Sequence, residues 1–184
     1  MLSFEDVKTM PDTDIGDLRA LILDDDTDDR ARIRDGLVDL GISDVRVADD
    51  PLAALDAMRA QAMDVLVTER YLSFVRFLRT DRKRPASHVP IVMISFHSRQ
   101  ADIHEARDAG VDEFLAKPID APRLLDRIVA AVGRSRPFVE CEAYVGPDRR
   151  RAEPGLDGFP DSETAGGPDI RLTEAEIAVL LERD

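Results

Sequence analysis

Short runs of consecutive apolar residues alternate along the chain with segments in which apolar residues recur every three or four positions. The runs lie at 18–23, 45–48, 65–68, 91–95 and 114–116. Such continuous runs are typical of strands that are buried on both faces of a parallel sheet. The segments after them begin near residues 27, 51, 71, 99 and 120, and their periodicity predicts amphipathic helices. The alternation predicts an α/β fold, a doubly wound (βα)5 parallel sheet.

Capping residues support several of these helices. Thr27 is placed to cap the first helix, and Asp28 and Asp29 would lie in its first turn, where the helix dipole favours negative charge. The pair Asp50-Pro51 has the order of a cap followed by a first-turn proline. Gly110 is suited to end the fourth helix.

The pattern divides the chain into four parts. Residues 1–17 are polar and without periodicity, which indicates a loose N-terminal leader. Residues 18–133 carry the alternating pattern and form the predicted domain. Residues 134–171 are rich in Gly, Pro, Arg and acidic residues, which indicates a linker or arm. Residues 172–184 predict a short C-terminal helix.

Composition narrows the classes of protein. The chain has 184 residues, a 43% hydrophobic fraction and a single cysteine, so an internal disulfide and a multi-cysteine metal site are excluded. The net charge of -13 opposes binding to nucleic acid. No apolar run reaches the length of a membrane span, and the N-terminus lacks the pattern of a signal peptide. We therefore expect a cytoplasmic protein that does not contact membranes.

Polar side chains follow several of the predicted strands. Asp24 and Asp25 follow the first strand, Glu69 the third and Lys117 the fifth, while Ser95 ends the fourth. Because the carboxyl ends of parallel strands meet at one edge of the sheet, these groups are expected to converge there. Carboxylates suit Mg²⁺, and an ammonium with a hydroxyl suits a phosphoryl group. Asp25 and Asp24 are candidate Mg²⁺ ligands, and a capping cluster is the alternative interpretation.

Four stretches, LILDDDTDDR, DVLVTE, VPIVMIS and AGVDEFLAKPID, resemble the receiver domain of two-component response regulators over residues 18–133. The resemblance implies a CheY-like, flavodoxin-like sheet with strand order 2-1-3-4-5 and a cis peptide at Lys117-Pro118. It implies that Ser95 and Phe114 act as a switch and that Lys117 and Pro118 border the phosphoryl site. It also implies a signalling protein of a phosphorelay, not an enzyme, whose partners are a histidine kinase or a downstream effector.

The sequence departs from the family pattern around the phosphoacceptor. Glu69 stands where the resemblance demands an aspartate, five residues after Asp64. Five strand residues at about 3.3 Å each place Asp64 about 16 Å away, at the other end of the sheet, so it cannot replace the acceptor. The loop after Glu69 is shortened, and Phe96 follows Ser95 where the family has a small residue. A phenylalanine there would crowd the entrance for phosphodonors.

These departures favour an atypical receiver, or pseudo-receiver, that signals by protein–protein interaction and is not phosphorylated conventionally. Whether Glu69 mimics a phosphorylated residue or pairs with Lys117 is left open by the sequence. One alternative is a phosphorylatable receiver. Another is an effector that binds a cyclic dinucleotide through two arginine clusters, at 79–84 and 149–151.

The C-terminal part carries two further features. Arg149, Arg150 and Arg151 follow a Gly-Pro-Asp turn and form a candidate site for an anion or a partner, most simply an acidic rim of the same or a neighbouring chain. The segment LTEAEIAVLLE is similar to the opening of a helix-turn-helix domain. Because the sequence ends at Asp184, we expect no recognition helix and no DNA binding, and its apolar patch favours docking or a homodimer.

Overall fold

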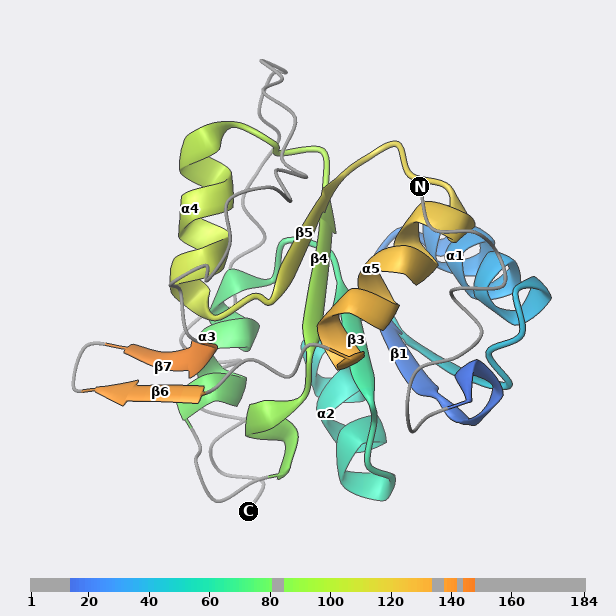
Figure 1. Cartoon of the computed structure of the whole chain (residues 1–184), viewed down its shortest axis with the longest axis horizontal. Helices are drawn as coiled ribbons and strands as arrows, with labels where there is room; N and C mark the ends of the chain where they lie inside the picture. Colours follow the sequence, from blue (N-terminus) through green and yellow to red (C-terminus); the bar gives the residue numbers. More distant parts are fainter. Residues whose placement is uncertain (1–13, 81–84, 134–137, 142–143, 148–184) are drawn as a thin grey trace.

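The computed structural model describes residues 14–80, 85–133, 138–141 and 144–147 (Figure 1). Its central feature is a five-stranded parallel sheet with the order β2-β1-β3-β4-β5. The strands are β1 (Arg19–Leu23), β2 (Asp44–Ala48), β3 (Val65–Thr68), β4 (Ile91–Ser95) and β5 (Glu113–Ala116). The predicted doubly wound fold and its strand order are confirmed.

Helices cover both faces of the sheet (Figure 1). They are α1 (Thr27–Asp39), α2 (Pro51–Ala60), α3 (Leu72–Thr80), α4 (Gln100–Ala109) and α5 (Ala121–Gly133). One apolar cluster joins α1 and α5 to the sheet, and a second joins α2, α3 and α4 to the opposite face. Short 3-10 turns, η1 (Ile15–Asp17) and η2 (Pro85–His88), precede β1 and β4.

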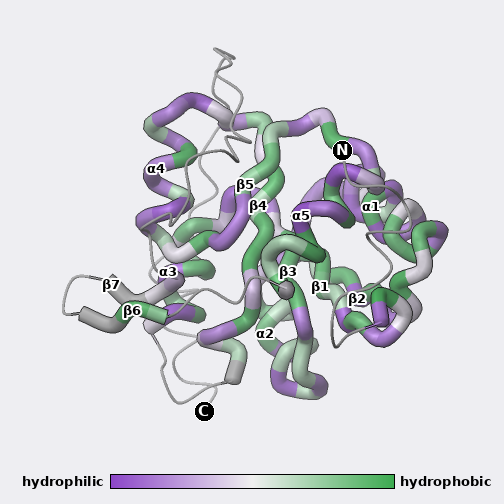
Figure 2. Tube along the Cα trace, viewed as in Figure 1, coloured by the Kyte–Doolittle hydropathy of each residue, from purple (hydrophilic) through white to green (hydrophobic). Residues whose placement is uncertain are grey.

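The central strands are apolar throughout because both of their faces are buried. In β1, Ala20 and Ile22 pack in the cluster with α1 and α5, whereas Leu21 and Leu23 pack in the other cluster. Figure 2 shows hydrophobic residues along the inner strands and hydrophilic residues on the outer helices. The two-sided core explains why continuous runs, not alternating ones, mark the strands in the sequence.

The start of α1 differs by one residue from the prediction. Asp26, not Thr27, is the cap: its side chain accepts hydrogen bonds from the backbone N–H groups of Asp28 and Asp29, each at 2.9 Å. The backbone of Asp26 is extended, whereas Thr27 is already the first helical residue, so only the earlier side chain reaches the free N–H groups. Asp50 caps α2, as predicted.

Two segments outside the predicted domain are ordered parts of the fold. Ile15 in η1 is buried in the cluster with α1 and α5, so residues 15–17 are not part of a loose leader. Within the predicted linker, β6 (Phe138–Cys141) and β7 (Tyr144–Pro147) pair as an antiparallel hairpin. The ring of Phe138 lies 4.4 Å from the His88 ring, which brings the hairpin to η2.

Several predictions concern residues outside the described ranges. They are the first part of the leader, the arginine turn at 149–151 and the C-terminal helix at 172–184. In the described part of the chain, no helix is long and apolar enough to cross a membrane.

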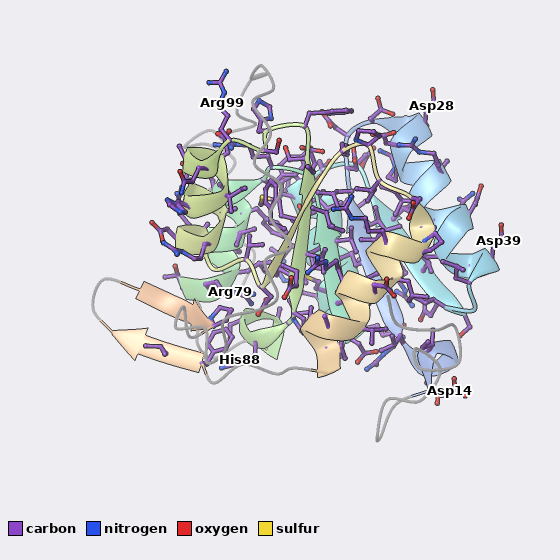
Figure 3. All side chains as sticks on the ribbon, turned by 45° about the horizontal axis from the view of Figure 1, so that its top comes forward. Asp14, Asp28, Asp39, Arg79, His88 and Arg99 are labelled. Carbon is purple, nitrogen blue, oxygen red and sulfur yellow. The ribbon has the colours of Figure 1, made fainter. Side chains whose placement is uncertain are left out.

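Arg79, at the end of α3 and in the first of the two predicted arginine clusters, is buried (Figure 3). Its guanidinium donates to the carbonyl oxygens of Gly110 (3.0 Å), Ser87 (2.7 Å) and Val89 (2.9 Å) and pairs with Asp112 at 3.0 Å. Buried carbonyls require donors, and one planar guanidinium serves three of them. Arg79 is therefore a structural residue and does not belong to an anion-binding cluster at 79–84.

Candidate functional site at the carboxyl ends of the strands

The polar residues that the sequence placed at strand ends meet at one edge of the sheet. Leu23 of β1 pairs with Thr68 of β3. The next residues, Asp24 and Glu69, therefore lie side by side at the ends of these neighbouring strands. Ser95 pairs with Ala116 in the same way, and Lys117 follows. The predicted convergence is confirmed for the side chains of Asp24, Glu69 and Lys117.

Lys117 is the centre of this cluster. Its Nζ lies 2.9 Å from Asp24 Oδ2 in a hydrogen bond, and it forms ion pairs with Asp29 Oδ2 at 2.9 Å and Glu69 Oε2 at 2.7 Å. Burial of the ammonium acts to lower the pKa of Lys117, but the contacts with Glu69, Asp29 and Asp24 together raise that pKa above its ordinary value. Lys117 is therefore held as a cation among three carboxylates.

Glu69 reaches Lys117 from a fixed backbone position. Its N–H donates to the Leu23 carbonyl at 2.9 Å, and its own carbonyl accepts from Tyr71 N–H at 2.7 Å. The Glu69 residue is 8% exposed. Of the two roles left open by the sequence, pairing with Lys117 is the one formed in this structure.

Phe96 lies over the ammonium of Lys117. The residue is 57% exposed, and Lys117 Nζ is 5.4 Å from the centroid of its ring. An ammonium within about 6 Å of an aromatic centroid is attracted to the ring face. The aromatic side chain thus adds to the carboxylates that hold Lys117, and it stands at the solvent-exposed border of the cluster.

The candidate Mg²⁺ ligands have other surroundings. Asp25 is exposed, whereas Asp24 is buried and uses its oxygens for Lys117 and for the backbone N–H of Asp26. Among the described residues, no group of three or more His, Cys, Asp or Glu side chains is arranged to hold a metal ion. The donor set in this arrangement does not fit a divalent cation, because the ammonium of Lys117 lies between the carboxylates.

The predicted switch residues lie beside this edge. Ser95 is buried, and its Oγ accepts a hydrogen bond from His97 N–H at 3.2 Å, so it caps the loop that follows β4. Phe114 is buried in the core with α3 and α4. The cis peptide at Lys117-Pro118 is confirmed. A switch function for Ser95 and Phe114 stays a prediction.

Asp64 lies at the opposite end of the sheet, as predicted. Its carboxylate accepts a hydrogen bond from the backbone N–H of Arg19 at 2.9 Å. It also accepts two hydrogen bonds from the guanidinium of Arg19, each at 2.9 Å. These hydrogen bonds with Arg19 hold the pKa of Asp64 below its ordinary value. Asp64 therefore anchors the start of β1.

Sequence reasoning missed three residues of the site. Asp29 looked like a dipole-favoured residue of α1, yet it pairs with Lys117. Tyr71 is buried, and burial together with the charges of Asp25 and Asp24 raises the pKa of its hydroxyl. Arg70 is buried and pairs with two carboxylates of α4. A usable indication existed for Arg70, since a charge between a buried strand and an apolar helix needs a partner.

The fold and the charged edge together define a class of protein. The chain belongs to the response regulator receiver domain family, whose model matches residues 20–129. The family is one of signalling domains in two-component systems, whose members interact with histidine kinases and effectors.

Individual relatives agree with this assignment. The chain is 31% identical to chemotaxis protein CheY of Pseudomonas aeruginosa over 117 residues, which are 60% of this chain and 93% of the relative. It is 28% identical to response regulator MprA of Mycobacterium avium over 165 residues, 89% of this chain and 71% of the relative. The solved receiver domain of Francisella response regulator 1452 has a TM-score of 0.59 at 24% identity, covers 65% of this chain and is itself covered fully, at 100%.

Proposed function

We propose that this protein is a pseudo-receiver, which signals by protein–protein contact and is not phosphorylated conventionally at the end of β3. The observation that supports the proposal is the pairing of Glu69 with Lys117 at 2.7 Å. The acceptor position thus carries a longer carboxylate whose charge is already matched by the ammonium that would otherwise contact a phosphoryl group.

Electrostatics give a second reason. Asp24, Asp29 and Glu69 share the single ammonium of Lys117, so the cluster already has an excess of negative charge. An acyl phosphate carries about -1.5 to -2 charges at neutral pH, in place of the single negative charge of the carboxylate from which it forms. Forming it on Glu69 would bring that charge next to two buried or half-buried aspartates without a new cation, which is unfavourable.

Access to Glu69 is the third consideration. The carboxylate oxygen that faces Lys117 is buried, and the Phe96 ring lies on the same ammonium. An incoming donor would have to separate the ion pair with Lys117 before this oxygen of Glu69 could attack phosphorus.

The remaining assignments follow from this proposal. Residues 18–133 act as the signalling domain in the cytoplasm, and a histidine kinase or a downstream effector is the partner. The hairpin β6–β7 is an addition to that domain, since Phe138 packs on His88. Docking of the C-terminal helix or formation of a homodimer would use residues outside the described ranges.

The test is incubation with acetyl phosphate and Mg²⁺, followed by intact-mass measurement. We expect no mass corresponding to an added phosphoryl group on the wild type. The matched variants are Glu69→Asp, which restores the family's residue, and Glu69→Asp with Phe96→Ala, which also opens the border of the cluster. A phosphoryl adduct on wild-type Glu69 would refute the proposal and establish the phosphorylatable alternative.

A further inference from the structure

Arg70 connects the altered acceptor segment to α4. It directly follows Glu69, and its side chain is 8% exposed. Its Nη1 lies 2.9 Å from Asp102 Oδ1, and its Nη2 lies 2.5 Å from Glu105 Oε2. One guanidinium therefore binds two carboxylates of a helix that is more than thirty residues away in the sequence.

The two carboxylates lie three residues apart in α4, so they are on the same face of the helix. Asp102 has a second role. Its Oδ2 accepts a hydrogen bond at 3.2 Å from the backbone N–H of Arg99, the residue that precedes α4. Arg70 thus holds the first half of α4, including its N-terminal turn.

The loop between β4 and α4 is anchored from the other side as well. Phe96, the residue after β4, lies over Lys117, and Lys117 pairs with Glu69. Consecutive residues of one segment, Glu69 and Arg70, therefore reach this loop and the helix after it: Glu69 through Lys117 and Phe96, and Arg70 by direct contact.

Burial separates this contact from an ordinary surface ion pair. Glu105 also pairs with Arg76 at 3.4 Å, but the Arg76 side chain is 50% exposed. An exposed pair is screened by water and contributes little. Arg70 is buried, whereas its partners Asp102 and Glu105 are 19% and 39% exposed, so loss of Arg70 removes a buried counter-charge from two partly exposed carboxylates and should cost more than loss of Arg76.

We propose that Arg70 is a positioning residue that fixes α4 against the Glu69 segment, so that the surface of α4 is held in one arrangement without phosphorylation. That this arrangement does not need phosphorylation rests on the proposed function. The contact itself is independent of that function, because it does not involve the Glu69 carboxylate.

The experiment is amide hydrogen exchange of the full chain, read by mass spectrometry on peptides that cover 96–109. For Arg70→Gln we expect exchange in this segment to rise about tenfold or more, because the helix opens locally when its buried counter-charge is lost. Peptides of α1 and β1 should keep wild-type rates. Arg76→Gln is the matched control: it removes the exposed arginine that contacts the same Glu105, and it should leave 96–109 unchanged.

Two further variants keep the proposal testable should Arg70→Gln fold poorly. Glu105→Gln removes one arm of the contact and should raise exchange at 96–109 by an intermediate amount. Arg70→Lys keeps the charge but loses the two-pronged geometry, and it should do the same. Wild-type rates at 96–109 in Glu105→Gln and Arg70→Lys, or in a folded Arg70→Gln, would overturn the proposal.

The two proposals fail separately. A phosphoryl adduct on the wild type, combined with faster α4 exchange in Arg70→Gln, would refute the pseudo-receiver but keep Arg70 as the residue that positions α4. No adduct, combined with unchanged exchange, would refute the role of Arg70 alone.

Discussion

Two buried cations of this molecule, Lys117 and Arg79, lie in contrasting surroundings. Lys117 contacts three carboxylates, those of Asp24, Asp29 and Glu69. Arg79 contacts three backbone carbonyls and the single carboxylate of Asp112. At the Arg79 site one cation pairs with one carboxylate and donates hydrogen bonds to the backbone carbonyls of neighbouring loops. At the Lys117 site three carboxylates share one cation. An excess of charge of this kind points to a site inherited for binding chemistry, and a balanced set points to structure.

The largest effect is expected from Arg79→Met. The change removes the side-chain donor from three buried carbonyls and the ion-pair partner from Asp112, so the free energy of unfolding should fall by about 3–5 kcal/mol. Urea denaturation measures it. Most of the unsatisfied groups are carbonyls, which do not titrate, so the loss should be nearly the same at pH 5 and pH 8. Arg76→Met, in the same helix but half-exposed, is the control and should change stability by less than about 0.5 kcal/mol.

A smaller loss with a different pH dependence is expected from Lys117→Met. At pH 8 the buried Asp24 and the Glu69 carboxylate lose their counter-ion, and the free energy of unfolding should fall by about 3 kcal/mol. Acid favours the uncharged form of a buried carboxyl that lacks a counter-ion, so the loss should shrink as the pH falls toward 5. If the loss of unfolding free energy in Lys117→Met were the same at pH 5 and pH 8, the Lys117 site would not differ from the Arg79 site in this respect.

The smallest effect is expected from Asp64→Asn, at the amino end of the sheet. Arg19 lowers the pKa of Asp64, so the ionised carboxylate stabilises the fold above its ordinary pKa of 3.8, and this contribution is lost as the pH falls through the lowered value. The pair is partly exposed, and the change in thermal midpoint at pH 7 should be no larger than for a surface ion pair. The midpoints of variant and wild type should converge at acidic pH; a difference that persists there would contradict the role of this charge.

The sheet order and the strand-end residues were predictable because they depend on local pattern. A continuous apolar run such as 65–68 indicates a strand that is buried on both faces. Parallel strands place their carboxyl ends at the same edge of the sheet, whatever side chains they carry. The position of Arg79 was not predictable. A cation at a helix end is usually solvated, and only the placement of Gly110 and Asp112 beside α3 gives this one its buried partners.

The hairpin β6–β7 was missed for a related reason. Its strands, 138–141 and 144–147, are short and lie in a segment rich in loop-forming residues, so no periodicity marks them. Phe138 contacts the His88 ring and the Arg79 guanidinium, which lie 50 and 59 positions earlier in the chain.

By itself the sequence determined the doubly wound fold of this protein and its resemblance to receiver domains, because hydrophobic periodicity and motif spacing are local properties. Only the tertiary structure decided that Lys117 is shared by Asp24, Asp29 and Glu69, and that Arg70 binds α4. The choice of an ion-pair partner depends on distances of a few ångströms between segments far apart in the chain. Those distances exist only after the helices have packed on the sheet.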